Sequence, residues 1–303
     1  MRKSINFVLS ASSNYLLVQR QILGTIQKHL HTDEYSLSEA AVVPGALNFS
    51  LFIRSGAEVV MSHGAADKNY LYTRAADGER IVNSLKHVFV PGNWLKNRLL
   101  ASKSVKLDPD QVHVVGWPRL DALLELRAAH QPERGHERRL KVLWAPTHDF
   151  ARRGADEIST SSYPALLEHV PEIEREFALS ISLHPRNRHN KRPTAELLIE
   201  ADVVISDFGT LVYEAWLLGK PVIFPHWLIG APICEFLPRS AEAKIFRERI
   251  GLHAGSFKEM LAILRSGPKI GDDVKAFLAE YVDPGARGHS GKRVAELLRE
   301  LAP

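Results

Sequence analysis

The sequence predicts an α/β protein built from two parallel-sheet, Rossmann-like domains that face each other across a cleft. Three observations support this fold class. Short apolar runs alternate with helical stretches, as they do in βα units on a parallel sheet. The chain has 303 residues, which is enough for two ordinary domains. A charged segment rich in turn formers, 128–141, separates two such arrays of comparable size.

The first array predicts an N-terminal domain over residues 1–130. Its apolar runs are short and bounded by turn formers, as strands are. The stretch after the first run has apolar residues spaced near the helical period. We expect strands at 5–11, 57–62, 87–92 and 111–116, and helices at 13–30 and after Asn93 and Asp121.

The second array predicts a C-terminal domain over residues 140–285, followed by a C-terminal helix within 286–303. This last helix is a candidate for packing back onto the first domain. We expect strands at 141–146, 178–185, 201–207 and 221–225, and helices at 163–177, at the start of 193–200, and at 210–218, 257–266 and 291–301.

The composition describes a folded chain without disulfides. Hydrophobic residues make up 45% of the chain and charged residues 24%, as in soluble globular proteins. The single cysteine, Cys234, excludes an intramolecular disulfide and fits a reducing compartment. No apolar stretch reaches the roughly 20 residues of a membrane span, and the opening MRKSINFVLSAS is too polar for a secretory signal. We therefore expect a cytoplasmic protein.

Basic residues gather in three clusters, at 133–141, 151–153 and 184–193. Such clusters suit a phosphate-bearing ligand, nucleic acid or an anionic membrane surface, and a solvated basic face is the alternative. No helix-turn-helix, zinc finger or aromatic RNA platform accompanies them, so nucleic acid is disfavoured as a partner. The Cys and His spacing does not predict a zinc site.

The apolar run 201–207 ends in Ser206-Asp207-Phe208-Gly209-Thr210, directly before a predicted helix. In open parallel sheets, ligands bind beyond the carboxyl ends of the strands, where helix N-termini present backbone N–H groups. Gly209 permits close approach of the backbone, and Thr210 offers a cap and a hydroxyl. The turn therefore predicts a phosphate cradle, with an ordinary βα turn as the alternative.

Four other strands also end in polar or ionisable residues, which core formation alone does not require. Because the carboxyl ends of parallel strands meet at one edge of a sheet, we expect these groups to line one site. The segments that follow the strands begin at His63-Gly64, Gly116-Trp117-Pro118-Arg119, Thr147-His148-Asp149 and His184-Pro185-Arg186.

The ordered set of motifs resembles one known family. The motifs are His63-Gly64 with Lys68, Gly116-x-Pro118-Arg119-x-Asp121, Ala145-Pro146-Thr147, His184-Pro185, Ser206-Asp207, Tyr213-Glu214 and Lys220-Pro221. In this order they resemble the CDP-glycerol glycerophosphotransferases, the teichoic acid and capsule polymerases, over about residues 57–300. That family is similar to GT-B glycosyltransferases, so the resemblance also implies two domains and a cleft. The chain departs from the family pattern at Gly209-Thr210, Glu214 and Ala65-Ala66.

The resemblance implies a transferase. An acceptor hydroxyl would attack a donor such as CDP-glycerol, CMP would leave, and a phosphodiester would form. His63 is the implied general base and His184 the second catalytic residue. Nucleotide and phosphate contacts are expected from Arg186, Ser206, Asp207, Gly209, Thr210 and Glu214, and supporting roles from Gly64, Lys68, Gly116, Pro118, Arg119, Asp121 and Thr147.

The resemblance further implies no bound metal or other cofactor. The expected partners are a nucleotide-activated donor, a polymer or lipid-linked acceptor, and an anionic membrane surface that holds the protein peripherally on the inner face of the membrane. Nucleic acid is not expected as a partner. An ion pair between Arg119 and Asp121, and an exposed position for Glu214, are the structural alternatives at those residues.

Three other functions compete with this interpretation. One is a GT-B glycosyltransferase that uses a CMP-Kdo or UDP-sugar donor in capsule or polysaccharide synthesis. A second is a UDP-sugar 2-epimerase, which needs no acceptor. The third is a non-catalytic nucleotide-binding module of a polymer-export assembly.

Overall fold

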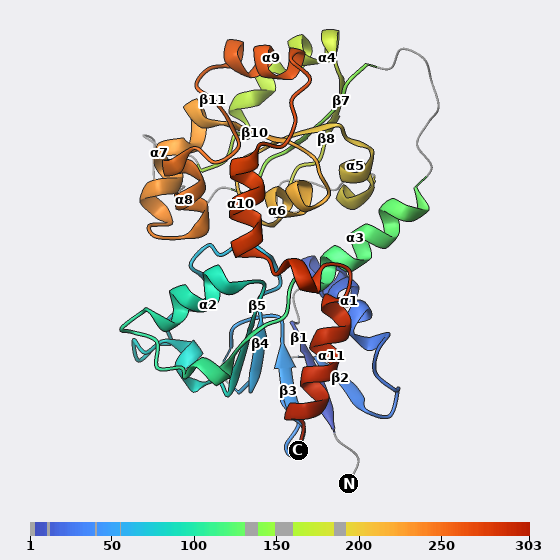
Figure 1. The fold of residues 1–303 in the computed structure, drawn as a ribbon, viewed down its shortest axis with the longest axis vertical. Helices are drawn as coiled ribbons and strands as arrows, with labels where there is room; N and C mark the ends of the chain where they lie inside the picture. The colour runs from blue at the N-terminus through green and yellow to red at the C-terminus, as the bar shows by residue number, and fades with distance from the viewer. Residues whose placement is uncertain are drawn as a thin grey trace. The chain divides into compact units, whose positions relative to one another are not determined.

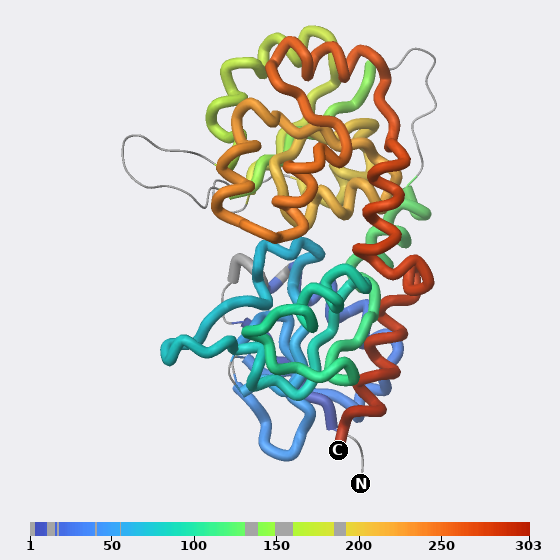
Figure 2. The backbone as a smooth tube through the Cα atoms, turned by 60° about the vertical axis from the view of Figure 1, so that its left-hand side comes forward, coloured from blue at the N-terminus to red at the C-terminus, as the bar shows by residue number. Residues whose placement is uncertain are grey.

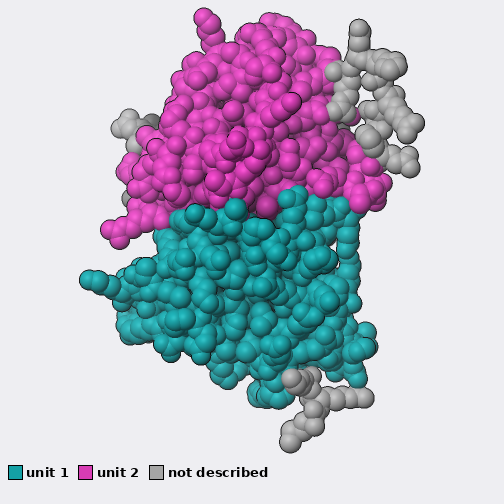
Figure 3. Space-filling model, in the orientation of Figure 1, with its two compact units in different colours: residues 1–65, 69–125, 279–303 teal, residues 66–68, 126–278 magenta. Residues whose placement is uncertain are grey.

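The chain folds into two compact α/β units (Figures 1 and 2). The structure is a computed structural model that describes residues 4–10, 13–39, 41–54, 56–130, 139–148, 160–184 and 192–303. The predicted contact Arg186, most of the basic cluster 184–193 and the whole of the cluster 151–153 lie outside the described residues. Figure 3 colours unit 1 (1–65, 69–125, 279–303) and unit 2 (66–68, 126–278) separately.

Unit 1 is built on a parallel sheet with the strand order β2-β1-β3-β4-β5-β6. The central strands are buried on both faces, as expected where helices cover a parallel sheet. The edge strand β2 is more exposed, with Leu37 54% accessible. The strands are β1 (Ile5–Leu9), β2 (Tyr35–Glu39), β3 (Leu47–Ser50), β4 (Val59–Met61), β5 (His87–Val90) and β6 (Val112–Val114).

Helices of unit 1 follow its strands in the chain, and the C-terminal helix of the chain also belongs to this unit. They are α1 (Ser13–Gln27), α2 (Asn93–Leu100), α3 (Pro118–Ala129), which runs into unit 2, and α11 (Ser290–Leu301), with 3-10 turns at Tyr70–Tyr72, Ile81–Ser84, Pro109–Gln111 and Pro284–Ala286.

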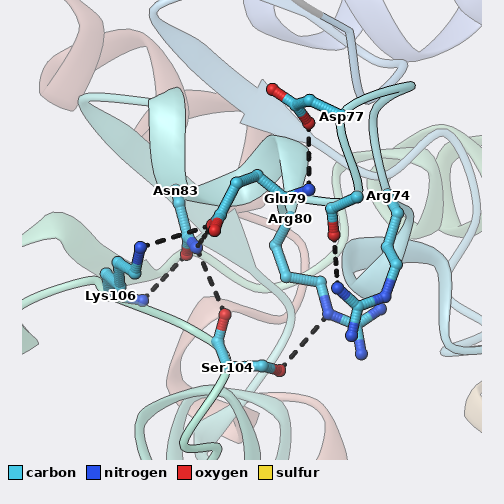
Figure 4. Close-up of polar contacts among 8 residues, drawn as sticks. Arg74, Asp77, Glu79, Arg80, Asn83, Ser104 and Lys106 are labelled. Atoms are coloured by element: carbon cyan, nitrogen blue, oxygen red, sulfur yellow. Dashed lines mark hydrogen bonds and ion pairs between the residues drawn. The ribbon is translucent and has the colours of Figure 1, made fainter.

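A polar network ties the loop between β4 and β5 to the segment after α2 (Figure 4). Arg74 and Arg80 face each other in an antiparallel bridge. Arg80 donates from Nε to the Ser104 hydroxyl at 3.3 Å, and the Lys106 ammonium lies 3.3 Å from Glu79. These contacts connect the two segments, but the exposed ion pair among them adds little to stability.

Unit 2 is built on a second parallel sheet with the strand order β11-β10-β9-β7-β8. Its core contains large buried side chains such as Trp144, Ile205 and Met260. The strands are β7 (Lys141–Ala145), β8 (Ala178–Ile181), β9 (Val203–Ser206), β10 (Val222–Pro225) and β11 (Leu252–Ala254), and the helices are α4 (Val170–Glu176), preceded by a 3-10 turn at Ala165–His169, α5 (Thr194–Glu200), α6 (Thr210–Leu217), α7 (His226–Phe236), α8 (Ala241–Glu248), α9 (Phe257–Arg265) and α10 (Asp272–Tyr281).

The C-terminal helix α11 packs on the first unit, as the sequence suggested. At its start, the Gly291 N–H donates to Asp121 at 2.8 Å, and the Ser290 hydroxyl accepts from the Trp117 N–H at 3.0 Å. At its end, Arg299 donates to Glu34 at 2.8 Å. Burial raises the pKa of Asp121 above its usual value.

The two units have different boundaries from the domains that the sequence predicts. Residues 66–68 belong to unit 2, where the backbone N–H groups of Asp67 and Lys68 donate to Glu242 of α8. Residues from 279 onward belong to unit 1, where the buried Tyr281 hydroxyl donates to the Ala65 carbonyl at 2.6 Å. These hydrogen bonds join residues more than 170 positions apart, which no local pattern shows.

Candidate functional site

The carboxyl edge of the unit 2 sheet collects several of the residues singled out in the sequence. Strands β9, β7 and β8 are neighbours, with Ala145 opposite Ser206 and Trp144 opposite Ile181. The segments that leave these strands therefore start side by side. They carry Asp207 and Gly209 after β9, Thr147 and His148 after β7, and His184 after β8.

The turn after β9 leads directly into the N-terminus of helix α6. Gly209 is the N-cap residue, with φ 105° and ψ −172°, a region that only glycine adopts readily. No side chain caps the helix from this position. The first turn, which begins at Thr210, therefore presents backbone N–H groups and the positive end of the helix dipole.

The ammonium group of Lys68 lies against this turn. A methyl group added at Gly209 would be 3.0 Å from Lys68 Nζ, and Nζ lies 4.7 Å from the centre of the Phe208 ring. A full positive charge therefore stands beside the N-terminus of α6. Both features attract anions, and phosphate is the anion that such sites commonly bind.

A buried network holds Lys68 in this position. The Glu242 carboxylate accepts hydrogen bonds from the N–H groups of Asp67 at 3.0 Å and Lys68 at 2.8 Å, and from the Tyr213 hydroxyl at 2.8 Å. Asp67 accepts in turn from the Ala241 N–H at 3.0 Å, at the start of α8. Glu242 is 1% exposed, and a carboxylate so deeply buried needs these donors.

The same network sets the backbone of the Lys68 segment. Lys68 and Asn69 have φ values of 44° and 54°, in the left-handed region that residues other than glycine seldom occupy. The two hydrogen bonds that the N–H groups of Asp67 and Lys68 donate to Glu242 offset the cost of this conformation. The geometry of Lys68 is therefore imposed by helix α8.

The Asp207 side chain accepts hydrogen bonds from the segments that follow β7. It is completely buried, and its Oδ2 accepts from the Thr147 N–H at 2.9 Å and from the Ser161 hydroxyl at 3.3 Å. Burial, the largest effect, raises the pKa of Asp207 to about 6, while hydrogen bonds oppose this rise. Asp207 and Thr147 thus join the ends of β9 and β7.

Ser206 and Glu214 are both buried in this structure. The Ser206 hydroxyl donates to the Ala145 carbonyl at 2.8 Å, so its proton is used between the two strand ends. Glu214 is 3% exposed, which rules out the solvent-exposed helical carboxylate considered as its alternative. A hydroxyl committed in this way favours a supporting role for Ser206.

His148 and His184 form a pair at the ends of β7 and β8. Their ring centres are 4.4 Å apart, with the planes tilted by 47°. His184 was expected from the sequence as a catalytic residue. The pair places two imidazoles, each able to donate a hydrogen bond, on the same sheet edge as the cradle.

His63 and Gly64 lie in unit 1, after strand β4. The His63 ring stacks on Phe52 with centres 4.5 Å apart and meets the edge of Tyr70 at 5.4 Å. The Gly64 N–H donates to the Ser62 hydroxyl at 3.4 Å. Aromatic packing on two sides therefore fixes the orientation of the His63 ring.

The motif that begins at Gly116 serves the packing of unit 1. A methyl group at Gly116, where φ is 79°, would lie 2.4 Å from the Ser290 hydroxyl oxygen. Pro118 is the first residue of α3. Arg119 donates to Gln21 of α1 at 2.6 Å, and Asp121 accepts from Gly291. This motif therefore joins α1, α3 and the start of α11.

Sequence analysis missed Glu242, Asp67, His226 and His253. Glu242 stands in the first turn of a helix whose N-cap, Ser240, accepts from the Ala243 N–H, so a helix start was readable there. Its partners at 67 and 68 were not, because they are distant in the chain. His226 directly follows strand β10, and the strand-end pattern that selected His184 also applies to it.

Among the residues that the structure describes, no helix combines the length and apolar character that crossing a bilayer requires. In the same residues, no three His, Cys, Asp or Glu side chains gather into a group able to hold a metal ion.

Comparison with solved structures identifies the fold. The wall teichoic acid polymerase TagF matches with a TM-score of 0.64 at 14% identity, over 98% of this chain and 88% of that one. The fold is GT-B-like. A UDP-GlcNAc 2-epimerase from Neisseria meningitidis, bound to UDP-GlcNAc, matches with a TM-score of 0.54 at 14% identity, over 98% of this chain and all of that one. A putative 2-epimerase from Listeria monocytogenes matches with a TM-score of 0.54 at 13% identity, over 99% and 96%.

Comparison at the level of sequence finds no relative. The chain matches no protein-family model and no curated protein. The likeness to TagF and the epimerases therefore shows the fold and not the activity.

Proposed function

We propose that the protein is a transferase that takes a nucleotide-activated donor and binds the donor's diphosphate at the N-terminus of α6. The observation that carries this proposal is the position of Lys68 Nζ beside Gly209. The buried carboxylate of Glu242 fixes the backbone of Lys68, and Gly209, which has no side chain, lets the Lys68 ammonium approach the start of α6. A buried network that fixes the position of a single lysine is explained if that lysine binds a ligand.

The charges of the site suit a diphosphate. The Lys68 ammonium and the positive end of the α6 dipole both attract an anion at the N-terminus of α6. Both attractions are stronger where water is excluded. His148 and His184 add two ring N–H donors along the edge. In a transferase, these groups would also stabilise the negative charge that develops on the leaving nucleotide.

For the donor, we propose CDP-glycerol or a related CDP-activated polyol phosphate. In this reaction the acceptor oxygen bonds to the phosphorus that carries glycerol, and the bond between that phosphorus and the CMP oxygen breaks. CMP leaves with the electron pair, and the acceptor proton passes to His63 as the general base. The motif resemblance and the fold shared with TagF support this choice. The acceptor would be a polymer or lipid-linked hydroxyl.

A UDP-sugar is the second candidate for the donor. The structural likeness to a UDP-GlcNAc 2-epimerase that spans nearly the whole of both chains favours it. The cradle at α6 serves either donor equally, since it acts on phosphate. Only the base and the transferred group distinguish the two candidates.

A thermal-shift panel of nucleotides tests the proposal. A ligand present at 100 times its Kd stabilises the folded state by about 2.7 kcal/mol, so CDP, CMP and UDP can be ranked with their activated forms. Stabilisation by CDP and CDP-glycerol supports the first candidate, and stabilisation by UDP and UDP-GlcNAc alone supports the second. A melting temperature that no nucleotide changes would reject both.

Replacing Lys68 by Ala tests the cradle itself. The substitution keeps the backbone N–H that binds Glu242 and removes the ammonium group together with the methylenes that carry it. We expect the affinity for the nucleoside diphosphate to fall tenfold or more, because a charge-assisted hydrogen bond contributes about 1.5–3 kcal/mol. Lys28→Ala, at an exposed lysine paired with Glu125, is the matched control. Equal affinities of the two variants would place the diphosphate elsewhere.

A further inference from the structure

A second histidine pair stands at the carboxyl edge of the unit 2 sheet, beside the phosphate cradle. His226 is the first residue of α7 and directly follows β10. His253 lies in β11, the next strand along. Their Nδ1 atoms are 2.9 Å apart, and the Nε2 atom of His253 is 3.0 Å from the carbonyl oxygen of Ile250.

These distances assign the proton on every ring nitrogen. A carbonyl oxygen only accepts, so His253 carries its proton on Nε2. In the neutral ring, His253 Nδ1 is then an acceptor, and the proton between the two rings belongs to His226 Nδ1. It follows that His226 Nε2 bears a lone pair. The rings form a chain of two hydrogen bonds that runs from Nδ1 of His226 through His253 to the Ile250 carbonyl.

The surroundings keep both rings neutral. Burial lowers the pKa of His253 to about 4, and it also lowers the pKa of His226. The Arg249 guanidinium, which donates to the His253 carbonyl at 2.9 Å, adds a positive charge that disfavours a second one. At neutral pH, His226 is therefore a hydrogen-bond acceptor at Nε2 and carries no charge.

The register of the strands places His226 near the cradle. Strand β10 pairs with β9, and Ile223 lies opposite Ile205. Strand β9 ends at Ser206 and β10 at Pro225, so Phe208 and His226 both lie within two residues of the ends of neighbouring strands, which are spaced roughly 4.8 Å apart. The Phe246 ring is close to both His226 and the turn after β9. Its centre is 5.5 Å from that of His226, and it lines a small cavity together with Phe208 and Gly209.

We propose that His226 Nε2 accepts a hydrogen bond from a hydroxyl group of the ligand whose phosphate occupies the α6 N-terminus. A bare lone pair repels phosphate oxygen and attracts a hydroxyl, and the hydroxyls next to the diphosphate are those of the ribose and of the transferred group. His253 is the positioning residue that sets the tautomer. This assignment rests on the proposed function, because the ligand is the activated donor.

Gly230 supports the assignment from within helix α7. A methyl group added at Gly230 would lie 2.4 Å from both Cδ2 and Nε2 of His226. The absence of a side chain four residues after His226 thus lets the ring lie over the helix. Gly230→Ala should displace the ring while keeping the histidine, and alanine is itself favourable in a helix.

Calorimetric titrations with CDP, CDP-glycerol, UDP and UDP-GlcNAc test the proposal. We expect His226→Leu and Gly230→Ala to weaken binding about fivefold or more, the size of one neutral hydrogen bond, and His226→Gln to restore part of the loss. A loss confined to the intact donors assigns the hydroxyl to the transferred group. An equal loss for free and activated nucleotides assigns it to the ribose.

His113→Leu, in the histidine pair of unit 1, is the matched control and should change no affinity. Ring ¹⁵N spectra at pH 7 give an independent readout, with His226 expected to be protonated at Nδ1 and bare at Nε2. A proton on Nε2, or variants that bind every ligand as wild type does, would overturn the assignment. If wild type binds none of the four nucleotides, the proposed function fails and this inference fails with it, whatever the ring spectra show.

Discussion

At the scale of single residues, the site uses buried carboxylates to place groups that a ligand can reach. Glu242 holds the backbone of Lys68, and Asp207 holds the turn at Thr147. Neither carboxylate is accessible enough to meet a substrate. This separation explains why strand-end motifs alone cannot distinguish the residues that touch a ligand from those that position them.

Asp207 should make stability depend on pH. Its pKa is about 6 in the folded protein, above the unfolded value near 3.9. The folded state therefore binds more protons between these values, and this group's contribution to stability is lost as the pH rises through them, by up to about 1.4 kcal/mol per pH unit. Asp207→Asn should flatten the decline in unfolding free energy between pH 4 and 6, as measured by denaturant titration.

Asp272→Asn is the control for this titration. Asp272 is exposed, and the Lys275 ammonium beside it lowers its pKa, so its own contribution to stability rises with pH, opposite to that of Asp207. Its replacement should therefore not flatten the decline. A wild-type slope that survives in Asp207→Asn would show that another group titrates.

His63 carries the strongest catalytic prediction. If it is the general base, His63→Ala should lower turnover about 100-fold or more while the donor affinity changes little, because a base acts on the reaction and contributes little to ground-state binding. Phe52→Leu, which removes the ring stacked on His63, should have a smaller effect. Product formation and donor titrations measure the two quantities. Equal turnover in His63→Ala and wild type would remove His63 from this role, and a nucleotide-binding protein without turnover in either form would be the non-catalytic module.

At the scale of elements, the sequence predicted the strands that form apolar runs and the helices with clear periodicity, and it missed elements with polar or irregular patterns. Strand β2 has an exposed, polar pattern, and β3 contains the polar residues Asn48 and Ser50. Helix α7 contains Pro232 in its interior, which argues against a helix in sequence analysis. Helix α10 begins with two aspartates, a start signal that we did not use.

The sequence also located the turn at the end of β9, but not the side chains that lie against it. The turn Ser206–Thr210 is local, and its glycine and threonine indicate a helix start directly. The approach of Lys68 depends on contacts between segments far apart in the chain, and so does the pairing of His148 with His184. Periodicity carries no information on such contacts.

Gly209 should be the least replaceable residue of helix α6. Alanine there would adopt a conformation that costs about 1–3 kcal/mol, and its methyl group would meet Lys68 Nζ. We expect Gly209→Ala to lose both stability and nucleotide affinity. Gly219→Ala is the matched control, since Gly219 also has a positive φ, 81°, but open space around it. It should lose about 1–2 kcal/mol of stability by strain and keep its affinity. Equal affinities of the two variants would contradict a ligand at α6.

At the scale of the whole molecule, each unit has its own sheet and core, and the chain passes between them more than once. Unit 1 takes in the C-terminal residues from 279 onward through α11, and unit 2 takes in residues 66–68 through Glu242. The catalytic histidine expected from the sequence belongs to unit 1, and the diphosphate cradle that we propose belongs to unit 2. The proposed chemistry therefore assigns a separate task to each unit.

Hydrogen exchange of the full chain can show this division of tasks. A nucleoside diphosphate bound at the cradle should slow exchange of the amides at the start of α6, around Thr147 and His148, and in residues 66–68, because binding to the folded state suppresses the local opening that exchange requires. The amides of β1 and β3 in unit 1 should keep their rates. With Lys68→Ala at the same nucleotide concentration, protection in unit 2 should fall with affinity. Protection spread evenly over both units, or confined to unit 1, would mean that the nucleotide binds through groups other than the α6 turn and Lys68.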